Sequence, residues 1–102
     1  MSDSSRSAAS DTQYIKGLLR SAIELDKSGD LSQAASAYRQ VVLSDPNNTQ
    51  ALQRYCNLVG PRDPASAQTL LRELMARPNL TAPSISTYLR YLMLYKEILG
   101  RM

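Results

Sequence analysis

The sequence predicts an all-α domain of about five helices. Apolar residues recur at three- and four-residue steps in five separate segments. The four glycines and five prolines lie mostly between these segments, where they interrupt helices. Helix-forming residues, above all Ala, Leu, Gln and Arg, are plentiful throughout the 102 residues.

The first helix is expected from about Asp11 to Lys27, because Tyr14, Leu18, Ala22 and Leu25 form one apolar stripe. The preceding residues 1–10, MSDSSRSAAS, are rich in serine and contain no apolar stretch. We therefore predict a disordered leader and no secretory signal peptide. A single cysteine excludes an internal disulfide, which is in keeping with a cytoplasmic, reducing environment.

Turn and capping residues predict where each later helix begins and ends. Glycine closes the first helix at Ser28-Gly29, and Asp30 with Gln33 forms a capping pair for the second. The later signals are, in chain order, a stop at Asp45-Pro46, a cap at Asn47 or Asn48, a break at Gly60-Pro61, a start at Asp63-Pro64, a stop before Pro78 and a start within Thr81–Ser84. The connections are short, so consecutive helices should pack as antiparallel neighbours.

The segment from Ile15 to Asn48 resembles a tetratricopeptide repeat (TPR), which is a pair of helices of about 34 residues. The matching positions are Ile15 at the start, Leu18 and Leu25 at large apolar positions, Ala22 and Ala34 at small positions, Gly29 at the turn, Tyr38 at the aromatic position and Pro46 near the end. Ser21 and Val41 depart from the pattern. A degenerate second repeat spans about 49–78 and is shortened at GPRD, and a terminal helix follows over about 82–101.

The resemblance implies that residues 11–102 form a short right-handed superhelix of antiparallel helix pairs. Small residues at Ala22 and Ala34 would allow two helices to approach closely, while Leu18 and Tyr38 fill the space beside them. Two other structures remain open. One is an ordinary helical hairpin with alanines on its inner face. The other is a three-helix bundle like that of microtubule-interacting and trafficking domains, which fits the first two helices but not the last two.

The resemblance also implies a concave face formed by the first helix of each pair. The residues expected on that face are Lys16, Leu19, Arg20, Ile23 and Lys27 in the first repeat, and Gln50, Gln53, Arg54 and Asn57 in the second. Arg20, Arg54 and Asn57 suit a carboxylate or a peptide backbone. The carboxylate clamp that some family members use for chaperone tails would need lysine and asparagine at Leu19 and Ile23, so we expect no such activity. Simple solvation of these polar residues is the alternative.

The terminal segment SISTYLRYLMLYKEILGRM is unusually apolar for one surface helix. Its polar residues Ser86, Arg90, Glu97 and Arg101 form a narrow stripe. The helix could be a fully buried closing helix, an interface with a partner or a second copy, or part of a longer array. For the interface we select Tyr88, Tyr91, Leu94, Tyr95 and Ile98, because tyrosine joins apolar area to a hydrogen-bonding tip.

The composition argues against most chemistry. The chain has no histidine, no cluster of metal ligands and no glycine-rich phosphate loop, so we predict no catalytic residue, no metal and no cofactor. Cys56 is expected to pack in the core, and no apolar run is long enough for a membrane span.

The predicted function is a non-enzymatic protein-interaction module, an adaptor or scaffold. The alternative is a self-assembly domain that dimerises through the terminal helix. Residues 51–102 carry seven Lys and Arg against three Asp and Glu, which slightly favours an acidic protein or peptide partner. No nucleic-acid docking motif accompanies these arginines, so we do not expect nucleic-acid binding.

Overall fold

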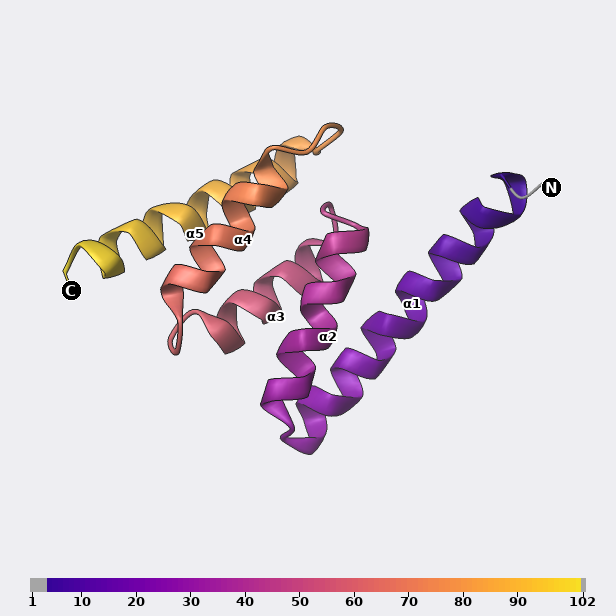
Figure 1. Cartoon of the computed structure of the whole chain (residues 1–102), viewed down its shortest axis with the longest axis horizontal. Coiled ribbons are helices and arrows are strands. Elements are labelled where there is room, and N and C mark those ends of the chain that lie inside the picture. Colours follow the sequence, from indigo (N-terminus) through magenta and orange to yellow (C-terminus); the bar gives the residue numbers. More distant parts are fainter. Residues whose placement is uncertain (1–3, 102) are drawn as a thin grey trace.

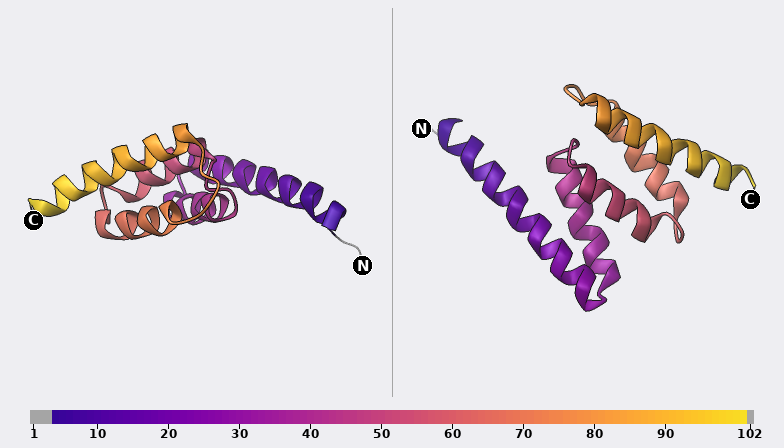
Figure 2. Two further views of the ribbon diagram at one scale, coloured as in Figure 1. Left: turned by 90° about the horizontal axis from the view of Figure 1, so that it is seen from above. Right: turned by 180° about the vertical axis from the view of Figure 1, so that it is seen from behind.

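In the computed structural model, the described residues 4–101 form five α-helices joined by short turns, and this part of the chain contains no strand (Figure 1). The all-α prediction is confirmed. The helices are α1 (Ser4–Ser28), α2 (Leu31–Ser44), α3 (Thr49–Val59), α4 (Pro64–Met75) and α5 (Ala82–Gly100). Consecutive helices run in opposite directions (Figure 1). The left view of Figure 2 shows α3 and α5 on one side of the molecule and α2 and α4 on the other.

The first helix begins earlier than predicted. Of the expected leader over 1–10, residues 1–3 lie outside the described residues, whereas residues 4–10 are helical and continue into α1. No glycine or proline interrupts this stretch, and Ala8 and Ala9 favour a helix. The N-terminal part of α1 extends beyond α2 (Figure 1).

The predicted ends of the inner helices are confirmed. The Asp30 carboxylate accepts a hydrogen bond from the Gln33 backbone N–H at 3.3 Å, and Gly29 adopts a positive φ of 89° at the turn. Helix α2 ends at Ser44, directly before Asp45-Pro46. Asp63 caps α4 in the predicted way, since its carboxylate accepts from the Ser66 N–H at 3.1 Å.

The contact between α1 and α2 depends on small side chains. Ala22 of α1 and Ala34 of α2 are both completely buried, as predicted. Tyr38 and Val42 of α2 are buried in the same core, which continues through Leu52 of α3 into α4. Because alanine adds only one carbon beyond the backbone, these positions allow a short separation between the helix axes.

Asn47 ties the α2–α3 turn to the loop before α5. Asn48 caps α3, which leaves the Asn47 amide free to donate to the Asn79 carbonyl at 3.0 Å and to accept from the Thr81 N–H at 2.9 Å. On the same turn, the Tyr88 hydroxyl donates to the Pro46 carbonyl at 2.7 Å. These bonds, which span 32, 34 and 42 residues, connect α5 and the loop before it to the α2–α3 turn.

Gly60 allows α5 to pack against the end of α3. The Tyr95 hydroxyl donates to the Cys56 carbonyl at 3.2 Å, beside Gly60. A Cβ at position 60 would lie 2.6 Å from that carbonyl oxygen and 2.7 Å from the Tyr95 hydroxyl, which is closer than real side-chain contacts allow. Burial, together with interaction with Cys56, raises the pKa of Tyr95, so its hydroxyl stays protonated and keeps donating.

Replacing Gly60 by alanine should loosen the contact between α3 and α5. The added methyl group displaces the Tyr95 ring, and we expect a loss of about 1–3 kcal/mol in the free energy of unfolding. The matched control is Gly17→Ala in α1, where a Cβ meets nothing within 4 Å. That change should stabilise the domain by about 0.5–1 kcal/mol, because alanine favours a helix. Urea unfolding of both variants checks the pair, and equal effects would contradict the close packing at Gly60.

Candidate functional site

The described residues contain little catalytic chemistry. No group of three or more His, Cys, Asp or Glu within residues 4–101 could hold a metal ion. None of the helices in this part of the chain is long and apolar enough to cross a membrane. Cys56 is buried, and burial raises the pKa of its thiol to about 11, so thiolate is scarce at neutral pH.

A hollow between α1, α2 and α3 gathers many of the residues predicted for the concave face. This α1–α3 hollow has a volume of about 410 Å³. Its lining residues are Ile23, Asp26, Lys27, Tyr38, Gln50, Gln53 and Arg54. Five of the nine predicted residues are among them, whereas Lys16, Leu19, Arg20 and Asn57 do not line this hollow.

Asp26 organises the α1–α3 hollow. Its Oδ2 atom accepts from Arg54 Nη2 at 2.6 Å, from Arg54 Nε at 2.9 Å and from the Tyr38 hydroxyl at 3.1 Å. One carboxylate thus joins α1, α2 and α3. The hydrogen bond to Asp26 raises the pKa of Arg54, and burial, followed by the bond to Asp26, raises the pKa of Tyr38.

This network adds a partner within the chain to the expectation for Arg54. The sequence predicted that its guanidinium suits a carboxylate or a peptide backbone of a partner, and in the structure a carboxylate of the same chain binds it. Asp26 follows Ile23 by three residues and therefore lies on a neighbouring part of the α1 surface, which is directed towards α3. The spacing of Ile23 and Asp26 could have indicated that Asp26 lies near the predicted face. The sequence alone does not give the orientation of α1 against α3, which brings Asp26 to Arg54.

The free cations of this surface come from α1. Lys16, Arg20 and Lys27 are exposed, and none of them makes an ion pair within residues 12–101. Their spacing places them with Ile23 along one face of α1, which leads to the hollow at Lys27. Because Asp26 is matched by Arg54, the surface around the hollow carries an excess of positive charge.

A second, more apolar hollow lies between α3 and α5. This α3–α5 hollow has a volume of about 280 Å³ and is lined by Cys56, Asn57, Gly60, Pro61, Tyr91, Leu94, Tyr95 and Ile98. It contains Asn57 and four of the five residues predicted for the α5 interface. The Tyr91 and Tyr95 rings stack with their centroids 6.1 Å apart. Because Asn57 follows Gln53 and Arg54 by one turn of α3, the two hollows adjoin.

Two of the tyrosines predicted for an interface belong instead to the core of the domain. Tyr88 and Tyr95 are buried, and their hydroxyls bond to the backbone at Pro46 and Cys56. Burial raises the pKa of Tyr88 to about 12. The prediction used the spacing of the tyrosines along the helix. In the structure, Tyr88 and Tyr95 face the rest of the domain, and each hydroxyl donates to a backbone carbonyl of the chain.

The outer face of α5 is more exposed than expected for a closing helix. Ile85, Leu89 and Met93 follow one another at four-residue steps and are 36%, 47% and 72% exposed. The helix is therefore not fully buried. This stripe is distinct from the α3–α5 hollow, because Leu94 at the hollow points to a different side of the helix from Met93.

Comparisons with protein-family models, with curated proteins and with solved structures found no match to this chain. Its two adjoining hollows and the charges around them are the basis for proposing a function.

Replacing Asp26 by asparagine should weaken the connection between α1 and α3. We expect a loss of about 1 kcal/mol in the free energy of unfolding, because Arg54 is partly exposed and water replaces some of the lost interaction. Asp30→Asn is the matched control, since it removes the same charge while asparagine still caps a helix. Urea unfolding at neutral pH compares the two. An equal change in both would show that Asp26 acts only through overall charge.

Proposed function

We propose that this chain is a non-enzymatic protein-interaction domain of TPR type, an adaptor or scaffold that binds a segment of a partner protein. The observation that carries the proposal is the pair of adjoining hollows, which share α3 and gather residues predicted from α1, α3 and α5. A surface that crosses three helices suits an extended segment better than a small molecule. In a TPR-type superhelix, this surface would be the concave face.

The chemistry of the two hollows describes the partner segment. Lys16, Arg20 and Lys27 are free cations beside the α1–α3 hollow, so the segment should carry acidic residues there. Gln50 and Gln53 supply amide groups that can bond to a peptide backbone. The α3–α5 hollow, with Leu94, Tyr91 and Ile98, should receive an apolar side chain.

A binding role is also favoured over an enzymatic one by the groups present. The one carboxylate of the α1–α3 hollow is engaged by Arg54 and Tyr38, and histidine is absent from the chain. The one thiol is buried and has a raised pKa. We place this role in the cytoplasm, because a reducing compartment would keep Cys56 as a free thiol.

Charge reversal and matched controls test the binding surface. Lys27→Glu and Leu94→Glu each alter one of the two hollows, whereas Arg72→Glu and Met93→Glu make the same kinds of change at exposed positions outside them. Partners crosslinked to the wild-type chain should lose at least about tenfold in yield with the first two variants and keep their yield with the controls.

Arg54→Glu is unsuitable for this test, because it would break the ion pair with Asp26 and disturb the fold. A partner that binds the Lys27→Glu and Leu94→Glu variants as well as the wild type would exclude the two hollows as its binding site. A partner lost with Met93→Glu alone would point instead to the outer face of α5.

Self-assembly through α5 is the second candidate function. Its support is the exposed apolar stripe of Ile85, Leu89 and Met93, since such a stripe is commonly covered in an assembly. In this case, sedimentation of the wild-type chain at tens of micromolar should show a dimer, and Met93→Glu should return it to a monomer. A wild-type monomer at that concentration would exclude the homodimer.

A further inference from the structure

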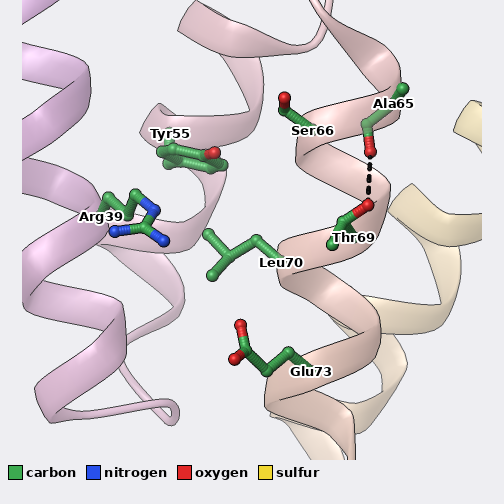
Figure 3. A pocket seen from close by; sticks show the side chains of 7 residues that line it. All are labelled: Arg39, Tyr55, Ala65, Ser66, Thr69, Leu70 and Glu73. Carbon is green, nitrogen blue, oxygen red and sulfur yellow. Dashed lines mark hydrogen bonds between the residues drawn. The ribbon is translucent and has the colours of Figure 1, made fainter.

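A third hollow lies on the other side of α3, between α2 and α4. Its volume is about 340 Å³, and its lining residues are Arg39 of α2, Tyr55 of α3 and Ala65, Ser66, Thr69, Leu70 and Glu73 of α4 (Figure 3). None of these residues lines the two hollows described above. We call it the α2–α4 hollow.

The hydroxyl of Tyr55 faces the α2–α4 hollow. Tyr55 is only 4% exposed, yet its hydroxyl makes no hydrogen bond within residues 12–101. Figure 3 shows this hydroxyl directed across the hollow towards α4. By contrast, the hydroxyls of Tyr38, Tyr88 and Tyr95 all donate to an oxygen of the same chain. Because the Tyr55 hydroxyl is open to the hollow, it can donate a hydrogen bond to a ligand that carries an acceptor there.

Two opposite charges stand on the two walls of the hollow. Arg39 extends from α2 and Glu73 from α4, and neither makes an ion pair within the described residues (Figure 3). The Thr69 hydroxyl donates to the Ala65 carbonyl at 3.0 Å, which leaves its oxygen able to accept. The wall at α2 and α3 therefore supplies donors, and the wall at α4 supplies acceptors.

The charges restrict the ligand. A simple anion would be attracted by Arg39 and repelled by Glu73, and a simple cation would meet the reverse situation. A molecule with both a carboxylate and an ammonium group matches both walls. Leu70 of α4 is buried, apolar and lines the hollow, where it can contact a small aliphatic group. The volume lies at the lower end of the range for small-molecule sites, about 300–1,000 Å³.

We propose that the α2–α4 hollow binds a free α-amino acid with a small aliphatic side chain. The carboxylate accepts from the Arg39 guanidinium and from the Tyr55 hydroxyl. The ammonium group donates to the Glu73 carboxylate and to the Thr69 oxygen, and the aliphatic group lies against Leu70. This proposal is independent of the proposed protein-binding function, because it uses none of the residues of the other two hollows.

Titration with L-valine, followed by amide nuclear magnetic resonance of the full chain, tests the site. We expect saturable shifts at residues of the α2–α4 hollow and no comparable shifts with N-acetyl-L-valine amide, which carries neither charge. Arg39→Gln, Glu73→Gln and Tyr55→Phe should each weaken valine binding, the two charge changes by about tenfold. Arg72→Gln, an exposed position of α4 outside the hollow, should leave binding unchanged.

Several results would overturn the proposal. They are the absence of saturable shifts with millimolar L-valine, equal binding of the uncharged amide, and equal weakening by Arg39→Gln and Arg72→Gln. Arg39 and Glu73 are exposed, so their variants should fold, and the spectrum of each free variant checks this directly. A further contradicting result has two parts: valine binds none of the proteins, and Arg39→Gln and Glu73→Gln lower the free energy of unfolding equally. It would show that the two side chains stabilise the fold and do not bind a ligand.

Discussion

The close contact between α1 and α2 is the constraint on which the rest of this structure depends. Ala22 of α1 and Ala34 of α2 are completely buried in one core cluster, and we infer that larger side chains there would separate the two helices. Their separation decides whether Asp26 of α1 can reach both Tyr38 of α2 and Arg54 of α3. The α1–α3 hollow, with its excess of positive charge, exists because these three helices are held at short range.

Local signals were enough to predict the all-helical class and the ends of the inner helices. The caps at Asp30 and Asp63 and the stop at Asp45-Pro46 depend on neighbouring residues only, so sequence reading found them. The start of α1 was missed, because a serine-rich composition argues for disorder while still permitting a helix. The role of Asn47 could not be predicted from the sequence, because its partners Asn79 and Thr81 lie more than thirty residues away and approach it only in the folded chain.

The candidate site was predicted in part, for a similar reason. The resemblance to a tetratricopeptide repeat predicted that Lys27 of α1 would share a surface with Gln50 and Gln53 of α3, and these three residues line one hollow. It did not identify the ion pair of Asp26 with Arg54, nor the unpartnered hydroxyl of Tyr55. Those features depend on how one helix is turned against another. The hollows on the two sides of α3 share no lining residue, so the protein segment and the small molecule that we propose as ligands would occupy separate surfaces.

The measurement that tests this account most directly is a double-mutant cycle at Ala22 and Ala34, followed by urea unfolding. Ala22→Val and Ala34→Val should each cost about 1–3 kcal/mol, because each overfills the contact between α1 and α2. If the larger side chains at positions 22 and 34 enter the same space between α1 and α2, the loss in the free energy of unfolding of the double variant should differ from the sum of the single losses by at least about 0.5 kcal/mol. Near-neutral single variants, or strictly additive costs, would show that α1 and α2 are not held together at these two positions.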